Sequence, residues 1–288
     1  MPDDFLKTLL LPIALITVLF GMGMSLTVAD FRRIVRAPLS SAVGLGCQMI
    51  LLPLVALALT RLLGLPGETA VGLMLLAACP GGPTSNLISH LSKGDTALSV
   101  TLTAASSVIA VFTIPWVVGA SMIHFLGSAS EIELPFLKTF VQLIVVTILP
   151  IALGMLVRAV RPQFADRMAR PANILSVVFL AVVIGLAVLR EDNLADQFRL
   201  AGPASMILNV LTMALGFATA ALFRLPRPQQ ITISIEAGIQ NGTLALAIAL
   251  GLLNSPGIAM PAVVYSLFMF VTGAAMILIF GLRKSARG

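Results

Sequence analysis

Residues 79–86 read CPGGPTSN and interrupt an apolar stretch that otherwise runs over residues 68–91. Two prolines remove backbone N–H donors and two glycines loosen the chain, so a continuous helix is not expected here. A second interruption, EAGIQNG at residues 236–242, places an acid and two amides among glycines. At membrane depth, freed backbone groups are tolerated only where they are buried in protein or line a cavity. The two segments therefore predict two broken membrane helices with a functional site.

The composition around these segments is that of a membrane protein. Of 288 residues, 58% are hydrophobic and 10% are charged, and the mean hydropathy is +1.05. A soluble domain carries about 25% charged residues, and a membrane span needs about 20 apolar ones. We expect an all-α polytopic membrane protein, a single transporter domain over residues 1–288, with about nine transmembrane helices. The apolar windows cover residues 9–27, 39–63, 68–91, 96–122, 133–158, 173–190, 202–223, 230–253 and 258–282.

The charges set an orientation for these spans. With nine spans, five of the 18 Lys and Arg residues fall on the side of the N-terminus and thirteen on the other side. The positive-inside rule then places the N-terminus outside and the C-terminus in the cytoplasm. The N-terminal apolar run follows the acidic start MPDDFLKT, which favours a retained span over a cleaved signal peptide. We expect a bacterial inner (plasma) membrane protein, and the absence of basic runs with interleaved aromatics argues against nucleic acid.

The two broken segments also predict an inverted repeat. Asn86 and Asn241 are 155 residues apart and five spans apart, and an odd number of spans makes the segments antiparallel. Transporters are commonly built from such repeats, with discontinuous helices at corresponding positions. We expect a first repeat over about residues 1–125 with four spans and a second over about 130–288 with five.

Of the twelve acids, eleven fall in tails, loops or the edges of spans, and Glu236 alone lies in the interior of a predicted span. A carboxylate at mid-membrane costs roughly 2.5 kcal/mol or more, so a functional role is the default interpretation. Gln240 shares its helix face, and glycine-loosened carbonyls beside the acid would complete an oxygen-rich cation site. The alternatives are a protonated carboxyl that donates an interhelical hydrogen bond, and a packing contact through Gly238 and Gly242.

Polar side chains near the first break are further candidates. Thr84, Ser85 and Asn86 follow it, at the positive end of the second half-helix. Ser99, Thr103 and Ser107 repeat every four residues one short loop later, although hydroxyls in membrane helices also bond to the carbonyl four residues back. Gln48 is the polar residue of the second span, as either interhelical contact or ligand. The two cysteines, Cys47 and Cys79, are expected to be small buried core residues.

The segments CPGGPTSN, ALSVTLT at 97–103 and EAGIQNG resemble those of the bile acid:sodium symporter (BASS) family along the whole chain. The resemblance implies a core bundle packed against a panel domain, inverted repeats, two crossing discontinuous helices and two sodium sites behind their crossing. Some members have ten spans and others nine, which matches the four and five spans of the halves here.

The resemblance also implies individual ligands. The first sodium site would comprise Ser85, Asn86, Ser99, Thr103 and Glu236. The second would comprise Gln48, Glu236 and Gln240 with the carbonyls of Ala237 and Ile239. Pro83, Thr84 and Asn241 would face the substrate, and Pro83 stands where the family often has a small hydroxyl residue.

We therefore expect a secondary transporter, not an enzyme, that couples sodium to the symport of an organic anion by alternating access. The substrate would be bile acid-like or a small carboxylate such as pantoate or pyruvate, the chain would be a monomer in the bilayer, and no cofactor beyond two sodium ions is implied. A proton-coupled or efflux carrier, as in distantly related arsenite and auxin carriers, is one alternative, which sodium dependence would separate. A non-transporting receptor or sensor is another, and it would bind ligand without accumulating it.

Overall fold

The computed structural model describes residues 11–127, 136–168 and 194–282, with isolated positions between 171 and 185. These residues are almost entirely helical, and within them the one extended contact is an antiparallel bridge between Gly81 and Gln240. The helices are α2 (Leu11–Ser25), α3 (Val28–Arg36), α4 (Pro38–Gly46), η2 (Cys47–Leu51), α5 (Leu52–Leu62), α6 (Gly67–Ala78), α7 (Pro83–Leu91), α8 (Thr96–Leu126), α9 (Phe136–Val160), α11 (Leu194–Leu222), α12 (Arg227–Gly238), α13 (Gly242–Gly251), α14 (Pro256–Met276) and η3 (Ile277–Gly281).

Eight of the nine predicted spans coincide with a described helix or with two or three consecutive helices. The sixth, residues 173–190, lies largely outside the described residues. By length and composition, four described segments can each cross a membrane unaided. They are Pro38–Leu62, Thr96–Leu126, Phe198–Leu222 and Pro256–Gly281. The all-helical polytopic architecture is thus confirmed, while the count of nine and the inverted repeat stay predictions.

Both predicted helix breaks are present. α6 ends at Ala78, and both Cys79 (φ −69°, ψ 151°) and Gly82 (φ −85°, ψ 156°) have extended backbone before Pro83 opens α7. Proline is favoured at this first helical position, because its fixed φ suits a helix and an N–H is not needed there. α12 ends at Gly238, and the side chain of Asn241 caps α13 by accepting a 3.0 Å bond from the Leu244 amide.

The second span contains a turn of π-helix, η2, that the sequence did not predict. Pro53 has no N–H to give to the carbonyl four residues earlier, so the regular α-helical ladder is broken just before it. The Leu52 amide bonds instead to the carbonyl of Cys47, five residues back. The wide turn carries Gln48 into the protein interior, where its side chain is fully buried.

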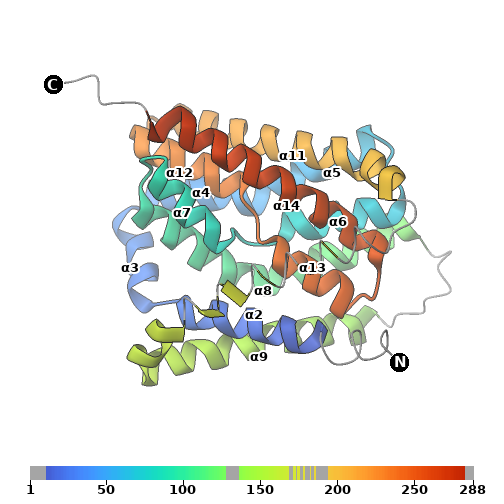
Figure 1. The fold of residues 1–288 in the computed structure, drawn as a ribbon, viewed down its shortest axis with the longest axis horizontal. Helices are drawn as coiled ribbons and strands as arrows, with labels where there is room; N and C mark the ends of the chain where they lie inside the picture. The colour runs from blue at the N-terminus through green and yellow to red at the C-terminus, as the bar shows by residue number, and fades with distance from the viewer. Residues whose placement is uncertain are drawn as a thin grey trace.

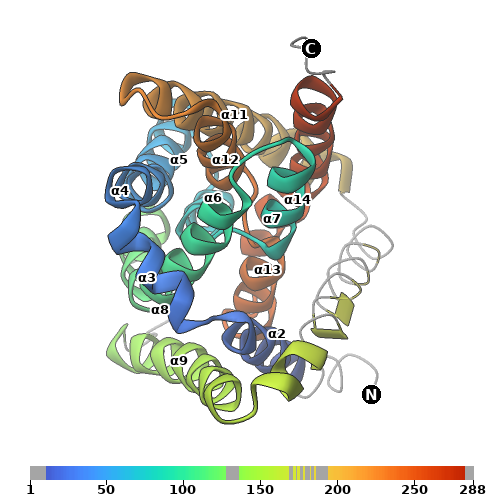
Figure 2. The same cartoon turned by 90° about the vertical axis from the view of Figure 1, so that its left-hand side faces the viewer.

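The helices form a bundle with a separate pair along one side (Figure 1). α2 and α9 lie side by side in both views and form this pair (Figure 2). They pack with their backbones in contact, since a Cβ atom at Gly23 would lie 2.2 Å from the carbonyl oxygen of Ile151. A Cβ atom at Gly154 would likewise lie 2.3 Å from the carbonyl oxygen of Phe20. The arrangement agrees with the panel that the family resemblance implies.

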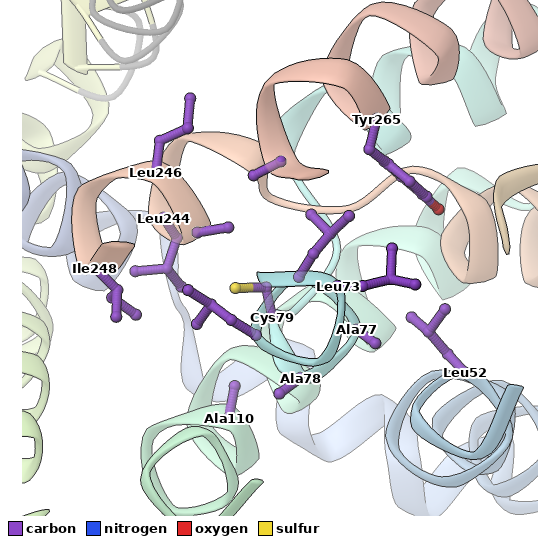
Figure 3. Close-up of a cluster of buried hydrophobic side chains, with 14 of the residues drawn as sticks. Leu52, Leu73, Ala77, Ala78, Cys79, Ala110, Leu244, Leu246, Ile248 and Tyr265 are labelled. Carbon is purple, nitrogen blue, oxygen red and sulfur yellow. The ribbon is translucent and has the colours of Figure 1, made fainter. Parts of the chain in front are cut away.

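α6 is the centre of the main bundle. Every residue from Thr69 to Ala78 is buried, so this helix is covered on all sides. Figure 3 shows its side chains Leu73, Ala77 and Ala78 among apolar groups of α5, α8, α13 and α14. Cys47 and Cys79 are both free and buried, as predicted. This apolar core holds the first half of one broken helix against the second half of the other.

α3 is a helix that the sequence prediction missed. Its nine residues fall in the loop expected between the first and second spans, and the segment carries Arg32, Arg33 and Arg36. Seen from the end of the bundle, α3 runs across that end from α2 to α4 instead of along the bundle (Figure 2). A short amphipathic helix of this kind is typical of the membrane surface, where apolar and charged faces are both accommodated.

Substitution at Gly72 tests the packing of α6. A Cβ atom there would lie 2.2 Å from the carbonyl oxygen of Ile258 in α14, and backbone cannot move aside easily. We expect Gly72→Ala to destabilise the protein by about 1–3 kcal/mol, seen as a lower thermal unfolding midpoint in detergent. Gly46→Ala is the control, because a Cβ atom at that helical glycine would meet nothing within 4 Å. Equal midpoints for the two variants would contradict the packing described here.

Candidate functional site: the helix crossing

The extended segments of the two broken helices cross and bond to each other. The Gly82 amide donates to the carbonyl of Ile239 at 3.2 Å, and the Asn241 amide donates to the carbonyl of Pro80 at 2.9 Å. Buried backbone groups that leave a helix need such partners, and each segment supplies them for the other. A Cβ atom at position 81 would lie 2.6 Å from Oε2 of Glu236, so a larger residue than glycine would displace this buried carboxylate.

Glu236 lies beside the crossing, and its carboxylate is fully buried. Oε1 accepts hydrogen bonds from the hydroxyls of Ser85 at 2.6 Å and Ser99 at 2.5 Å. Oε2 accepts from the hydroxyl of Thr103 at 3.0 Å and from Nε2 of Gln48 at 3.3 Å. The ion pairs of the described residues, Arg158–Asp166 and Arg199–Asp196, lie elsewhere, so no described cationic side chain neutralises this acid.

The residues of the predicted first sodium site gather around the carboxylate of Glu236, with Ser85 and Ser99 at Oε1 and Thr103 at Oε2. The Ser99 hydroxyl lies 2.8 Å from Oδ1 of Asn86 as well as beside Glu236, so its single hydrogen faces two acceptors. The Ser85 hydroxyl likewise lies 2.7 Å from the carbonyl of Gly82 and beside the same carboxylate. Oxygen atoms thus outnumber the hydrogens available to bridge them. A small hard cation among these oxygens would relieve their mutual repulsion.

The predicted second site is brought together in large part. Nε2 of Gln48 donates to the carbonyl of Glu236 at 2.9 Å, and Nε2 of Gln240 donates to the carbonyls of Glu236 and Ala237 at 3.1 Å each. Oε1 of both glutamines is buried without a hydrogen-bond partner. Rotation of each amide by about 180° would exchange its nitrogen and oxygen, so both oxygens could face a cation held by the same carbonyls. The Ile239 carbonyl has a different partner, the Gly82 amide of the crossing.

The three hydroxyl side chains that repeat every four residues along α8, those of Ser99, Thr103 and Ser107, do not all bond in the same way. Ser99 and Thr103 bond to the carboxylate of Glu236, whereas the hydroxyl of Ser107 donates to the carbonyl of Thr103 four residues back. Ser107 therefore follows the alternative interpretation of such stripes, in which the hydroxyl satisfies its own helix.

A cavity of about 270 Å³ lies on the side of the crossing next to α2. All three predicted substrate residues, Pro83, Thr84 and Asn241, line it. The N-terminal ends of α7 and α13 meet there, and helix N-termini favour a negative charge. Gln240 of the predicted second sodium site also lines the cavity. The sequence did not predict the apolar part of the wall, which includes ordinary residues of α2, α7 and α14: Val18, Met22, Leu87, Met269 and Phe270.

The two half-helices that leave the crossing differ in exposure. In α13, every residue from Gly242 to Ala249 is buried. In α7, Pro83, Leu87 and Leu91 are exposed, with Leu87 at 60%. α7 runs from the crossing toward the end of the molecule where the C-terminus lies, and α13 toward the other end (Figure 1). α13 is thus enclosed by protein, whereas α7 has one exposed face, and Pro83 and Leu87 of that face line the cavity.

Two buried residues that the sequence prediction missed form hydrogen bonds with the backbone at the end of α12, where the second helix is broken. Nδ2 of Asn209 and the hydroxyl of Tyr265 both donate to the carbonyl of Gly238, at 2.7 and 2.8 Å. This carbonyl ends α12 and has lost its partner within the helix. Tyr265 is the only tyrosine of the chain, and Asn209 is a lone amide in an apolar span. Each could therefore have been identified from the sequence as a polar residue that needs a buried partner.

Crossed broken helices around a buried acid and polar side chains are typical of membrane transporters. Comparison with known proteins agrees. The profile of the Sodium Bile acid symporter family matches residues 12–197. The chain belongs to this family of transporters and is an integral membrane protein, not an enzyme.

Relatives of known name match over most of this chain. It is 30% identical to the "Uncharacterized sodium-dependent transporter YocS" of Bacillus subtilis (strain 168), over 90% of this chain and 79% of that protein. It is 28% identical to the "Probable sodium/metabolite cotransporter BASS2, chloroplastic" of Oryza sativa subsp. japonica, over 94% and 64%. It is 30% identical to the human "Sodium/bile acid cotransporter 4", over 82% and 54%. The chain thus spans less than two thirds of the latter two proteins.

Alanine at Ser99 or Thr103 tests the first cation site. If these hydroxyls are ligands, each substitution should raise the sodium concentration for half-maximal thermal stabilisation by roughly fivefold, the equivalent of about 1 kcal/mol. Ser121→Ala is the matched control, since this hydroxyl of the same helix bonds only to the carbonyl of Val117 among the contacts described here. An unchanged sodium dependence in both site variants would assign these hydroxyls to structure alone.

Proposed function

We propose that the chain is a sodium-coupled symporter that imports an organic anion by alternating access. The observation that carries the proposal is the carboxylate of Glu236, which is fully buried, lacks a described cationic partner and belongs to both sets of polar ligands. A buried charge is expensive unless it is paired, and a bound cation is the partner that these oxygens fit. The names of the relatives, sodium-dependent transporter and sodium cotransporter, support sodium as that cation.

Charge balance favours two sodium ions and a monoanion. Two cations, one ionised Glu236 and one monoanionic substrate sum to zero, so the fully loaded site crosses the membrane without a large electrostatic penalty. Partly loaded states carry a net charge and are disfavoured, which limits transport of sodium without substrate. Each cycle would then move one net positive charge inward, worth about 2.3 kcal/mol per 100 mV of membrane potential.

The substrate would bind in the cavity beside the crossing. Its negative charge would face the N-termini of α7 and α13, near Thr84 and Asn241. Pro83, Met269 and Phe270 give the cavity apolar walls, which favours an anion with an apolar part over a compact, fully polar one.

Removal of the carboxylate charge tests the proposed function. Glu236→Gln keeps the side-chain shape but removes an attraction on the order of 4 kcal/mol per cation at an effective dielectric of about 20. We expect the sodium concentration for half-maximal thermal stabilisation to rise at least about a hundredfold, so that the stabilisation by sodium chloride over potassium chloride disappears.

Glu68→Gln is the control for this experiment, because Glu68 is an exposed acid whose carboxylate accepts a bond from the Ser255 hydroxyl. It should keep the sodium response of the unmodified protein. If Glu236→Gln kept its sodium response, the carboxyl would be a neutral structural donor and the shared-carboxylate mechanism would be wrong. A screen of organic anions by the same thermal assay, in sodium and in potassium, would identify the substrate.

The orientation is tested separately by labelling. In a protein without Cys47 and Cys79, single cysteines at Arg32, Arg167 and Arg283 should resist an impermeant thiol reagent in intact cells, because the charge split places them in the cytoplasm. Arg32 and Arg167 are exposed, so they will react once the membrane is permeabilised, and this serves as the control. Arg283 lies outside the described residues. Labelling of all three in intact cells would reverse the orientation.

A further inference from the structure

α3 crosses one end of the bundle (Figure 2), and a small pocket lies where α3 meets α4 and α8. It has a volume of about 100 Å³ and is formed by the last turn of α3, the first turn of α4 and the start of α8. Its polar lining consists of Arg33, Arg36, Ser41, Asp95 and Thr101. The pocket is separate from the proposed sodium and substrate sites and shares no residue with them.

The charges in this pocket favour an anion. Arg33 and Arg36 contribute two guanidinium groups, and neither belongs to the ion pairs of the described residues. Asp95 is turned to other partners, since one carboxylate oxygen accepts from the Leu98 amide at 3.0 Å and the other from Nε2 of Gln229 at 3.4 Å. The same Asp95 caps the first turn of α8, whose 31 residues direct the positive end of a helix dipole here.

Ser41 supplies an independent indication of a ligand. It lines the pocket, is only 1% exposed, and its hydroxyl has no hydrogen-bond partner among the described residues. An unpaired buried polar group destabilises a protein, so such a group is usually paired in the functional state. Thr101, by contrast, satisfies its hydroxyl with the carbonyl of Ala97. An acceptor oxygen inside the pocket would pair the Ser41 hydroxyl and meet both guanidinium groups.

We propose that this pocket binds a phosphate group, supplied by an anionic phospholipid of the adjacent leaflet. Guanidinium groups match phosphate oxygens in bidentate pairs, and basic pockets at the cytoplasmic ends of membrane helices bind lipid headgroups. Next to the pocket, Val35 is 80% exposed and Leu39 is 50% exposed, which provides an apolar surface for the acyl chains. The bound headgroup fixes α3, the link between α2 and α4, to the start of α8.

The test compares lipids and free phosphate on the purified full-length protein in detergent. Dioleoyl phosphatidylglycerol, dioleoyl phosphatidylcholine and inorganic phosphate are added separately, and the thermal unfolding midpoint is followed as a function of concentration. We expect phosphatidylglycerol to raise the midpoint and phosphatidylcholine to leave it unchanged. Arg33→Gln/Arg36→Gln should lose most of the rise. Arg32→Gln, which removes the same charge from the same helix outside the pocket, should keep it.

The comparison of lipid with inorganic phosphate shows which of the two supplies the phosphate group. If inorganic phosphate alone gives the full shift and the lipid adds nothing, the pocket binds free phosphate and the lipid assignment is overturned. Equal losses in Arg32→Gln and in the double variant, or no shift with any ligand, would overturn the pocket itself. If the double variant does not fold, Ser41→Ala replaces it, with a smaller expected loss, since one hydroxyl donor is removed and both charges stay.

Discussion

A buried carboxylate without a described cationic partner is the constraint on which the rest of this structure depends. Glu236 is held by three hydroxyls and one amide, contributed by the second span, by α7 and by α8. These elements can reach it only because α12 ends two residues later and because Gly81 allows the other broken helix to pass close by. Both helix breaks and the π-helical turn at Gln48 therefore lie next to the same carboxylate, that of Glu236.

Sequence reasoning could predict the parts of this site where a helix-breaking or polar residue stands in an apolar membrane span. Prolines and glycines in an apolar run predicted the break before α7, and an acid with two amides predicted the break before α13. Glu236 and Gln48 were identifiable because polar groups in a membrane span need a reason to be there. The structure gathers these distant residues around a single carboxylate.

The cavity wall, α3 and the orientation of the α8 hydroxyls could not be predicted, because their residues are ordinary for their place in the sequence. The apolar wall of the cavity uses Met22 and Phe270, which look like any lipid-facing or core residue of a membrane helix. α3 is only nine residues long, and its basic character suited a cytoplasmic loop as well as it suited a surface helix. Which of the repeated hydroxyls of α8 would face Glu236 depended on packing, since Ser107 shares their spacing but bonds to its own helix.

The shared position of Glu236 has a consequence for the energetics of ion binding. Its carboxylate contacts the ligands of the first predicted site, and its backbone carbonyl accepts bonds from both glutamines of the second. Whatever occupies one set must therefore alter the other, by turning an amide or by redirecting a hydroxyl hydrogen. Thermodynamic linkage makes such an influence reciprocal, so the two ions would bind with a common coupling free energy. Sodium saturation would then depart from that of two independent sites because of one residue of the chain, without movement of a distant domain.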